Sequence, residues 1–399
     1  MKILYYCAHP YLNLTSMSGY GTHMREMIHA FRELGHEVKP VIMGGTESSD
    51  SHAAHTGGMK EIAKSLIPRR TIEWLKDWQL LRFDRHAKNV LTEAVTAFSP
   101  DLIYERAAYL QLSGVETARA HQIPHILEIN APFAEESKEL RGPGGHYQKA
   151  LTVEKAQMKM SDLNVFVSTA LRDYALEHYG LPIQKTLITP NAINPNHQAV
   201  DWDLVAKCKA QYGWTSDQPI IGFVGSIFPW HGVDLLIHAF EEVTNEFPEA
   251  RLLIVGDGEI LPELKSEVVG KAIESKIIFT GKVPHQEVFS YIHLMDITVM
   301  AKSNWYGSPV KIFEYGVMGK AIIAPDNIPV RDVMVDQEDG LLVDAEKSQL
   351  VAALKMYLKD AQMRARIGQH FQKKVKTKHL WEANARHVLE ALTAEKAYR

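Results

Sequence analysis

Short apolar runs alternate with longer amphipathic stretches along most of the chain. In the first half, the runs KILYYCA, VKPVIM, DLIYER, HILEIN and LNVFVS are typical of buried strands. In the second half, PIIGFVGSI, RLLIVGDG, KIIFTGKV, DITVMA and AIIAP repeat the pattern. Strands that alternate with helices predict an α/β fold, with parallel sheets that carry helices on both faces. In such sheets, ligands bind beyond the carboxyl ends of the strands.

The length of the chain predicts more than one domain. Its 399 residues exceed the size at which one hydrophobic core keeps growing. The stretch ITPNAINPNHQ, residues 188–198, carries two Pro–Asn turn signals and no periodicity, which is typical of a domain boundary. We expect domains at residues 1–192 and 193–375, followed by a helical segment at 376–399.

The composition is that of an ordinary soluble protein, 46% hydrophobic and 23% charged. A formal net charge of -4 gives no electrostatic reason to expect nucleic acid as a partner. Cys7 and Cys208 are the only cysteines and lie far apart in sequence, which fits a reducing compartment. The first apolar run, ILYYCA, is too short to span a membrane and lacks a signal-peptide cleavage pattern. These features predict a cytoplasmic protein.

The most informative stretch follows the run DITVMA and reads SNWYGSPVKIFEYGVMGKAIIAP. Gly307, Ser308 and Pro309 predict a turn, with Pro309 at the first position of a helix. A helix N-terminus there would direct free N–H groups at an anion. Lys311 and Glu314 share one face of the first turns, where lysine suits a phosphate and glutamate can accept both hydroxyls of a ribose. The pattern predicts a site for a phosphorylated, hydroxyl-rich ligand; the alternative is an ordinary loop and helix with a surface ion pair.

A long loop, HPYLNLTSMSGYGTH, follows the first strand-like run and carries Gly19 and Gly21. We expect it to end in Thr22 or a neighbour as a helix cap. The loop is too long for a dinucleotide-binding fingerprint, and no third glycine completes that pattern. The glycines therefore favour close approach of the backbone to a ligand across a cleft, with a plain flexible loop as the alternative.

Polar residues follow another strand-like run, within HILEINAPFAEESKELRGPGGHY. Glu128 and Asn130 fall at the carboxyl end of the predicted strand, which Pro132 then breaks. That position is where a doubly wound fold keeps its substrate contacts. The alternative for Glu128 is a structural role as partner of a buried amide.

The segment Met59–Asn89 is both basic and aromatic, with Trp74 and Trp78 among its lysines and arginines. A basic amphipathic helix can lie on an anionic membrane surface. Acidic residues dilute the charge, so a solvated helix face is the favoured interpretation. Peripheral contact with a membrane, at its inner face, is the alternative.

Six motifs in order give the chain a resemblance to the retaining glycosyltransferases of family 4, also described as glycosyl transferases group 1. They are GYG, FVGSIFPWHGVDLLI, LLIVGDGE, FTGKVP, YGSPVKIFEYGVMGKAIIAP and DGLLV, and together they span nearly the whole chain. The resemblance implies the GT-B fold, in which two Rossmann-like domains face each other and a C-terminal helix crosses back. It also implies that the C-terminal domain binds a nucleotide-sugar donor and the N-terminal domain an acceptor.

The resemblance assigns roles to particular residues. Val283 and its neighbours would meet the nucleobase, Glu314 the ribose, and Lys311 the diphosphate and sugar. The donor-binding residues that it implies are Gly21, Ser226, His231, Gly256, Asp257, Val283, Gly307, Ser308, Pro309, Lys311 and Glu314. The acceptor-binding residues expected are Glu128, Asn130 and Arg141, and those expected to take part in catalysis are Glu128, Asn130 and Tyr306.

The sequence departs from the family pattern at four positions. Tyr306 stands where many members carry the first of two glutamates, and a tyrosine cannot act as an anionic base at neutral pH. Ser226 and His231 replace a common arginine and lysine, and Asn130 stands near the place of a common histidine. A diphosphate beside His231 would favour the imidazolium form, so we expect donor binding to strengthen on acidification. The alternative is that His231 is an ordinary loop residue.

The function expected is transfer of a sugar, with retention, from a nucleotide diphosphate sugar to an acceptor hydroxyl that the sequence does not identify. A UDP-sugar is expected because it is the commonest donor in the family. No cofactor or metal is expected, since the acidic motif DWD at Asp201–Asp203 follows the domain boundary and is interpreted as a helix start. The alternatives are a catalytically silent nucleotide-sugar binding protein and a nucleotide-sugar epimerase.

Overall fold

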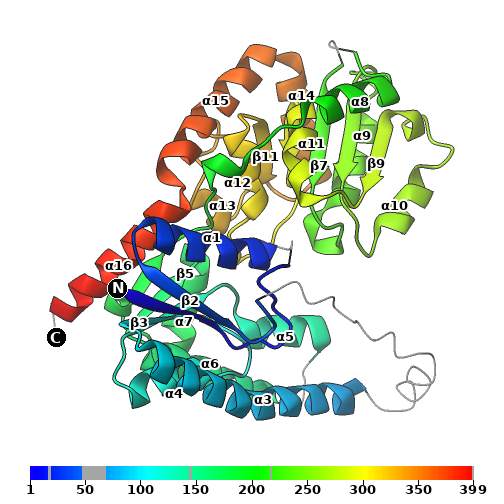
Figure 1. Cartoon of the computed structure of the whole chain (residues 1–399). Helices are drawn as coiled ribbons and strands as arrows, with labels where there is room; N and C mark the ends of the chain where they lie inside the picture. The colour runs from blue at the N-terminus through cyan, green and yellow to red at the C-terminus, as the bar shows by residue number, and fades with distance from the viewer. Residues whose placement is uncertain (17–18, 47–68, 143–145, 216–217, 398–399) are drawn as a thin grey trace. The chain divides into compact units, whose positions relative to one another are not determined.

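The computed structural model describes residues 1–16, 19–46, 69–142, 146–215 and 218–397. Its internal contacts divide the chain into two compact units (Figure 1). The N-terminal unit comprises Met1–Thr189 and Glu382–Arg399, and the C-terminal unit comprises Pro190–Trp381. The division after Thr189 falls inside the aperiodic segment 188–198. On the C-terminal side, residue 376 lies within a helix that continues to Lys378.

The N-terminal unit is built on a parallel sheet with the strand order β2-β1-β3-β4-β5-β6. Its strands are β1 (Lys2–Cys7), β2 (Glu37–Ile42), β3 (Leu102–Arg106), β4 (His125–Ile129), β5 (Leu163–Phe166) and β6 (Thr186–Ile188). Its helices are α1 (Gly19–Glu33), α3 (Arg69–Phe98), α4 (Ser113–Ala120), α5 (Phe133–Arg141), α6 (Tyr147–Met160), α7 (Thr169–Tyr179) and most of α16 (Trp381–Ala397).

Side chains of β1 alternate between the two faces of this sheet, as the period of a strand requires. Leu4 and Tyr6 pack with Leu91 and Val95 of α3. On the other face, the ring of Tyr5 stacks on the ring of Tyr104 at 5.3 Å, and Tyr104 meets Phe31 of α1 edge-on at 5.2 Å. Helices therefore cover both faces, as predicted.

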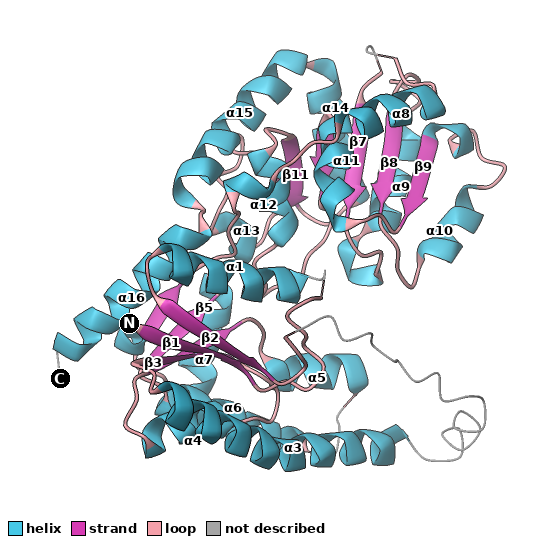
Figure 2. Cartoon of the chain, viewed as in Figure 1, coloured by secondary structure: helices cyan, strands magenta, loops and turns pink. Residues whose placement is uncertain are grey.

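The C-terminal unit has a second parallel sheet, with the order β12-β11-β10-β7-β8-β9. Its strands are β7 (Ile220–Val224), β8 (Arg251–Val255), β9 (Ile277–Gly281), β10 (Ile297–Val299), β11 (Ala321–Pro325) and β12 (Leu341–Val343). Its helices are α8 (Trp202–Tyr212), α9 (Val233–Val243), α10 (Leu261–Val268), α11 (Val288–Leu294), α12 (Val310–Val317), α13 (Ile328–Arg331), α14 (Lys347–Lys359) and α15 (Ala361–Lys378), drawn by type in Figure 2.

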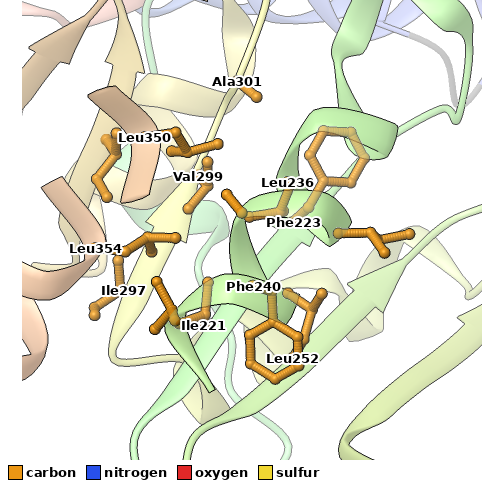
Figure 3. Close-up of a cluster of buried hydrophobic side chains, with 14 of the residues drawn as sticks. Ile221, Phe223, Leu236, Phe240, Leu252, Ile297, Val299, Ala301, Leu350 and Leu354 are labelled. Atoms are coloured by element: carbon orange, nitrogen blue, oxygen red, sulfur yellow. The ribbon is translucent and has the colours of Figure 1, made fainter. Parts of the chain in front are cut away.

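Two hydrophobic clusters fill the two faces of this sheet. Figure 3 shows the first, where Ile221 and Phe223 of β7 meet Leu236 and Phe240 of α9. In the second, the intervening residues of the strands pack on α8, α11, α12 and α15. Each fully buried leucine or phenylalanine contributes about 1.5–3 kcal/mol relative to an exposed one. These clusters fix where the loops at the carboxyl ends of the strands emerge.

The strand order places a topological switch point in each unit. In the N-terminal unit, the chain runs from β1 outward to β2 and then returns to β3 on the other side of β1. In the C-terminal unit, it runs from β7 through β8 to β9 and returns to β10 on the other side of β7. Ligands of doubly wound sheets bind at such points, beyond the carboxyl ends of the strands. A ligand site is therefore expected at the loops after β1 and β3 and at those after β7 and β10.

Three details of local structure bear on the sequence-based expectations. Helix α1 begins at Gly19, so Gly21 and Thr22 lie inside its first turn, and the expected cap at Thr22 is wrong. Pro309 is the residue that precedes α12 and not its first helical residue. The DWD motif does start a helix, because Asp201 caps α8 by accepting the Leu204 N–H at 3.0 Å.

Candidate functional site

The loops after β7 and β10 pack against each other at the switch point of the C-terminal unit. A Cβ added to Gly232, at the end of the first loop, would lie 2.8 Å from Cγ of Lys302 and 3.1 Å from Cβ of Ala301 in the second. The backbone of Gly232 adopts φ +69°, which favours glycine. The close packing holds the two loops in one arrangement, with α12 beginning where the second loop ends.

Lys311 extends from the first turn of α12 toward this switch point, and Glu314 lies one turn further along the same helix. Nζ of Lys311 lies 3.3 Å from the position of a Cβ on Gly225, directly after β7, and 5.1 Å from the centroid of the Phe223 ring. Burial lowers the pKa of Lys311 to about 8, although Glu314 opposes this shift. Burial likewise raises the pKa of Glu314, against the influence of Lys311.

Neither Lys311 nor Glu314 forms an ion pair with another described residue. Both side chains are half-buried, and within the described part of the chain neither has an oppositely charged partner within 4 Å. Burying an ammonium group without a close counter-ion is unfavourable in the absence of a ligand. An anion bound at the carboxyl end of β7 would relieve that cost for Lys311.

The turn before α12 is held by hydrogen bonds from outside it. The Gly307 N–H donates to Oδ1 of Asn304 at 2.7 Å. Ser308 is only 9% exposed, and its Oγ accepts the backbone N–H of Asn191 at 2.9 Å. The Asn191 side chain also donates to the Ser308 carbonyl at 2.7 Å. Ser308 therefore fixes the turn to the start of the C-terminal unit, and the first N–H groups of α12 gain a defined direction.

His231 lies in the 3₁₀ turn η3 (Pro229–His231), at the end of the loop after β7. Its Nδ1 lies 2.5 Å from the carbonyl oxygen of the exposed Ser226. Since a carbonyl can only accept, Nδ1 carries the hydrogen and Nε2 of the neutral ring carries a lone pair. Burial, together with the nearby charge of Lys311, lowers the pKa of His231 to about 4. The free protein therefore holds His231 uncharged at neutral pH.

The glycines after β8 allow three loops to come together at this edge. A Cβ on Gly256 would lie 1.9 Å from the carbonyl oxygen of Gly225, so this residue must be glycine, and its φ of +135° requires the same. The Gly256 N–H donates to the Gly281 carbonyl at 3.0 Å, and the Asp257 carbonyl accepts the Ile227 N–H at 2.9 Å. Val283 follows β9 and is half-buried. These contacts join the loops after β7, β8 and β9 into one surface.

The C-terminal unit thus gathers most of the donor-binding residues predicted for it at one edge of its sheet. Tyr306 belongs to the same loop as the turn before α12. It is 7% exposed, and its ring meets that of Trp305 edge-on at 5.3 Å.

In the N-terminal unit, Glu128 is the centre of a buried hydrogen-bond network. Oε1 lies 2.8 Å from Nε2 of His23 and accepts hydrogen bonds from Arg106 at 2.9 Å and Asn130 at 2.7 Å. Oε2 accepts the Tyr104 hydroxyl at 2.6 Å. Burial would raise the pKa of Glu128, but His23, Arg106 and Tyr104 outweigh it and bring the pKa to about 2. A carboxylate with these contacts, 1% exposed, orients its neighbours.

Asn130 and Arg141 differ in how far they are engaged. Asn130 is half-buried, and its amide nitrogen is held by Glu128, which leaves the amide oxygen to accept from a ligand. Arg141 ends α5, with its guanidinium 3.8 Å from both Glu73 and Asp77 of α3. Its charge is therefore partly balanced within the unit.

Gly21 is enclosed by the loop that precedes its helix. A Cβ at this position would lie 2.1 Å from the carbonyl oxygen of Ser16. Arg25, one turn further on, donates to the carbonyl oxygens of Leu14 and Ser16 at 2.7 and 2.6 Å. Gly21 thus lets the loop after β1 fold back tightly onto α1.

Sequence reasoning missed two residues at the switch point of the N-terminal unit. His9 follows β1, and Arg106 is the last residue of β3. His9 accepts the Tyr11 N–H on Nδ1 at 3.2 Å, so Nε2 carries the hydrogen in the neutral ring. Burial, then Arg141 and Arg106, lowers the pKa of His9 to about 4. The signal available was a polar residue directly after a buried strand.

The described residues contain no metal-binding cluster and no membrane-spanning helix. No cluster of three or more His, Cys, Asp or Glu side chains in these ranges has a metal-binding arrangement. Among the same residues, every helix is too short or too polar to cross a lipid bilayer.

Comparison with curated proteins finds distant relatives that match parts of the chain. An uncharacterized glycosyltransferase of Methanocaldococcus jannaschii is 23% identical over 59% of this chain and 59% of its own length. An alpha-D-kanosaminyltransferase of Streptomyces kanamyceticus is 26% identical over 41% of this chain and 42% of its own. A GDP-mannose-dependent mannosyltransferase of Mycolicibacterium smegmatis is 24% identical over 46% of this chain and 49% of its own length. The matches span less than two thirds of each of these relatives.

Solved structures show the same fold over the whole chain. A sucrose-phosphate synthase from Thermosynechococcus elongatus superposes with a TM-score of 0.72, covering 100% of this chain and 99% of its own at 15% identity. The Anabaena HepE protein in complex with UDP-glucose gives a TM-score of 0.70, covering 99% and 100% at 17% identity. These likenesses confirm the expected two-domain GT-B fold.

Two family models match successive stretches of the sequence. Residues 17–197 match the model described as Glycosyltransferase Family 4, and residues 206–374 match the model described as Glycosyl transferases group 1. Together the matches cover most of both units. The chain belongs to the group 1 and family 4 glycosyltransferases.

Proposed function

We propose that this protein is a glycosyltransferase that moves a sugar from a nucleotide diphosphate sugar to an acceptor hydroxyl. The observation that carries the proposal is the half-buried Lys311 ammonium, without a close ion-pair partner in the described residues, beside the N-terminus of α12 at a switch point. Membership of the family supports it, and so do the Anabaena HepE structures in complex with UDP and with UDP-glucose.

Each group at this edge has a task in the proposed reaction. Lys311 and the first N–H groups of α12 bind the diphosphate and stabilise the charge that develops as it leaves. Glu314, one turn further along the helix, accepts hydrogen bonds from the ribose hydroxyls. The surface formed by Gly256, Asp257 and Val283 receives the nucleobase.

The N-terminal unit supplies the acceptor site in this proposal. Asn130, oriented by Glu128, accepts a hydrogen bond from an acceptor hydroxyl through its amide oxygen. Arg141 lies at the end of the helix that follows and contacts a polar part of the acceptor.

Retention fits the chemistry of these groups. Attack on the same face as the leaving group, with the leaving phosphate accepting the proton of the acceptor hydroxyl, requires positioning and charge stabilisation more than a strong base. The buried Tyr306 is compatible with such a reaction because no anionic base is needed at its position. A product that keeps the anomeric configuration of the donor, measured by NMR, supports this step, and an inverted product refutes it.

UDP is the proposed nucleotide, and a metal ion is not required. Because relatives include GDP-mannose-dependent enzymes, the donor is best determined by the thermal shift that UDP, GDP and ADP each produce. Lys311 and the helix N-terminus would stabilise the leaving diphosphate in place of a metal. Turnover that survives EDTA unchanged agrees with this, whereas loss of turnover restored by Mg²⁺ or Mn²⁺ contradicts it.

We also propose that α3 makes peripheral contact with the inner face of a membrane, from the cytoplasmic side. Trp74, Leu75 and Trp78 are each more than 40% exposed, and the Arg82 guanidinium lies 5.7 Å from the Trp78 ring centroid. Residues 59–68 of the basic segment lie outside the described residues. Sedimentation with anionic vesicles, lost in a Trp74→Ser/Trp78→Ser variant, supports contact; equal recovery with zwitterionic vesicles or in that variant refutes it.

The test of the function itself is slow donor hydrolysis. A transferase incubated with labelled UDP-sugars or GDP-mannose releases free nucleotide diphosphate, because water replaces the acceptor. A silent binding protein releases none, and an epimerase converts one nucleotide sugar into another. Release that is abolished by Lys311→Met but kept by Lys373→Met, an exposed lysine of α15, assigns the activity to this site.

A further inference from the structure

Two aromatic rings form a solvent-facing stack in the loop after β7. The rings of Phe228 and Trp230 lie 4.7 Å apart and within 7° of parallel. Phe228 is half-buried, whereas Trp230 is 47% exposed. The next residue, His231, is fixed by its hydrogen bond to the Ser226 carbonyl, which closes the loop from Ser226 to His231. Trp230 is therefore held by a packed partner and a closed loop, with its indole presented to solvent.

The stack lies at the switch point, next to the polar groups of the proposed donor site. The ring of Trp230 is 6.1 Å from that of His231, whose pKa responds to Lys311. Trp305, in the loop after β10, is also large, aromatic and 41% exposed. Polar and charged groups beside an exposed aromatic side chain suit a ligand that is both hydroxylated and ring-shaped.

The strand order indicates which part of a nucleotide sugar meets Trp230. The loop after β7 lies between the loop after β10, which holds the Gly307 turn, and the loops after β8 and β9, where the nucleobase is proposed to bind. Gly232, two residues after Trp230, packs on Lys302 and Ala301 of the β10 loop. The end of the β7 loop that carries Trp230 and Gly232 therefore contacts the β10 loop, beside which the sugar is expected.

We propose that Trp230, backed by Phe228, is a stacking platform for the pyranose ring of the donor and so helps to determine which sugar is transferred. The negative face of an indole attracts the partly positive C–H groups on one face of a pyranose. Hexoses differ in which C–H groups are axial on each face of the ring, so a platform of this kind distinguishes them by shape. This inference rests on the proposed donor site.

The test compares binding of a nucleotide with binding of its sugar conjugate. Calorimetry on the whole protein measures the Kd of UDP, UDP-glucose, GDP and GDP-mannose for the wild type and for Trp230→Ala. The matched control is Trp202→Ala, which removes an exposed tryptophan of α8 in the same unit. Trp230→Phe keeps an aromatic face, and the melting temperature of each variant verifies that it is folded.

Stacking predicts a selective effect. Trp230→Ala should raise the Kd of the nucleotide sugar by about fivefold, equivalent to about 1 kcal/mol, and should leave the Kd of the bare nucleotide unchanged. Trp230→Phe should retain most of the affinity, and Trp202→Ala all of it. Equal weakening of nucleotide and nucleotide sugar, or none, in a folded Trp230→Ala overturns the inference. If the wild type binds none of the four ligands, the proposed donor site itself fails.

Discussion

The ammonium nitrogen of Lys311 occupies the space that a side chain at Gly225 would fill, 3.3 Å from the position of a Cβ there. The two residues come from different elements, the loop after β7 and helix α12, and meet only because β7 and β10 are neighbours in the sheet. The glycine thus gives the cation access to the carboxyl end of a strand. Its φ of +141° adds a second reason for glycine at this position.

The first prediction concerns Gly225→Ala. The new Cβ would press on Cε and Nζ of Lys311 and strain the backbone, at a cost of about 1–3 kcal/mol in the free energy of unfolding. Gly270→Ala is the matched control, because Gly270 also has a positive φ, +75°, but nothing within 4 Å of its Cβ position. Both variants should lose stability in urea titrations, and only Gly225→Ala should bind UDP more weakly. Equal UDP affinity in the two variants would separate Gly225 from the ligand site.

The second prediction is a pH dependence of donor binding. His231 is neutral in the free protein, with a pKa near 4, and faces Lys311 of α12 and the Ser226 carbonyl. A bound diphosphate raises this pKa, so binding takes up a proton and strengthens as pH falls from neutrality toward 4, by at most about tenfold per pH unit. The expected window is thus lower than the ordinary histidine pKa suggests. The Kd of UDP from pH 5 to pH 7, measured for the wild type and His231→Gln, tests it.

The comparison with His231→Gln is essential because the terminal phosphate of UDP also titrates. Only the part of the pH dependence that the variant loses belongs to His231. If the Kd of UDP depended on pH with the same slope in the wild type and in His231→Gln, His231 would not contribute to the pH dependence of binding.

The third prediction uses the buried carboxylate Glu128. Its pKa is near 2 in the folded protein and near 4.5 in the unfolded chain. The charged Glu128 carboxylate therefore stabilises the fold above pH 4.5, and this contribution is lost as pH falls through 2. The difference amounts to about 3 kcal/mol. Glu128→Gln should therefore unfold at lower urea concentration at pH 7 and lose less stability than the wild type on acidification. Glu93→Gln, an exposed glutamate of α3, should follow the wild type throughout; a Glu128→Gln curve parallel to both would contradict the charge network.

The fourth prediction has the opposite sign. Glu154 of α6 accepts the Ala134 N–H at the start of α5, at 2.9 Å. Burial outweighs this bond and a contribution from Tyr179, and raises the pKa of Glu154 to about 7. Stability from this group is complete below pH 4.5 and lost as pH rises through 7, by about 3 kcal/mol. Glu154→Gln should gain stability relative to the wild type over that range in thermal melts, and a constant difference between the two would refute the shift.

The alternation of strands and helices was predictable because local periodicity determines it. Asp201 was identified as a helix start from a short motif, for the same reason. Local sequence patterns do not determine the order of strands in a sheet, and the contacts that form the site depend on that order. Asn191 with Ser308, and His23 with Glu128, are pairs separated by more than a hundred residues.

The partners of a polar side chain also come from distant parts of the chain, so the sequence alone did not decide between a structural and a functional role for such a residue. Glu128 was predicted from its place at a strand end, but only the neighbouring strand shows that Tyr104 and Arg106 hold both its oxygens. For His231, the sequence predicted that a bound diphosphate would favour the imidazolium, but it did not reveal that burial beside Lys311 lowers the pKa of this histidine to about 4. His9 was overlooked because a single polar residue after a strand carries little signal by itself.

The most direct test of the account is calorimetric titration of UDP and GDP into the wild type, Lys311→Met and Glu314→Ala, with Lys373→Met as control. In this account the N-terminus of α12 with Lys311 binds the diphosphate, and Glu314 binds the ribose. Each site variant should therefore raise the Kd of the nucleotide that the wild type binds by about tenfold or more, equivalent to about 1.4 kcal/mol. The control should bind as the wild type does. An unchanged Kd in folded Lys311→Met and Glu314→Ala would place the nucleotide elsewhere and contradict the account.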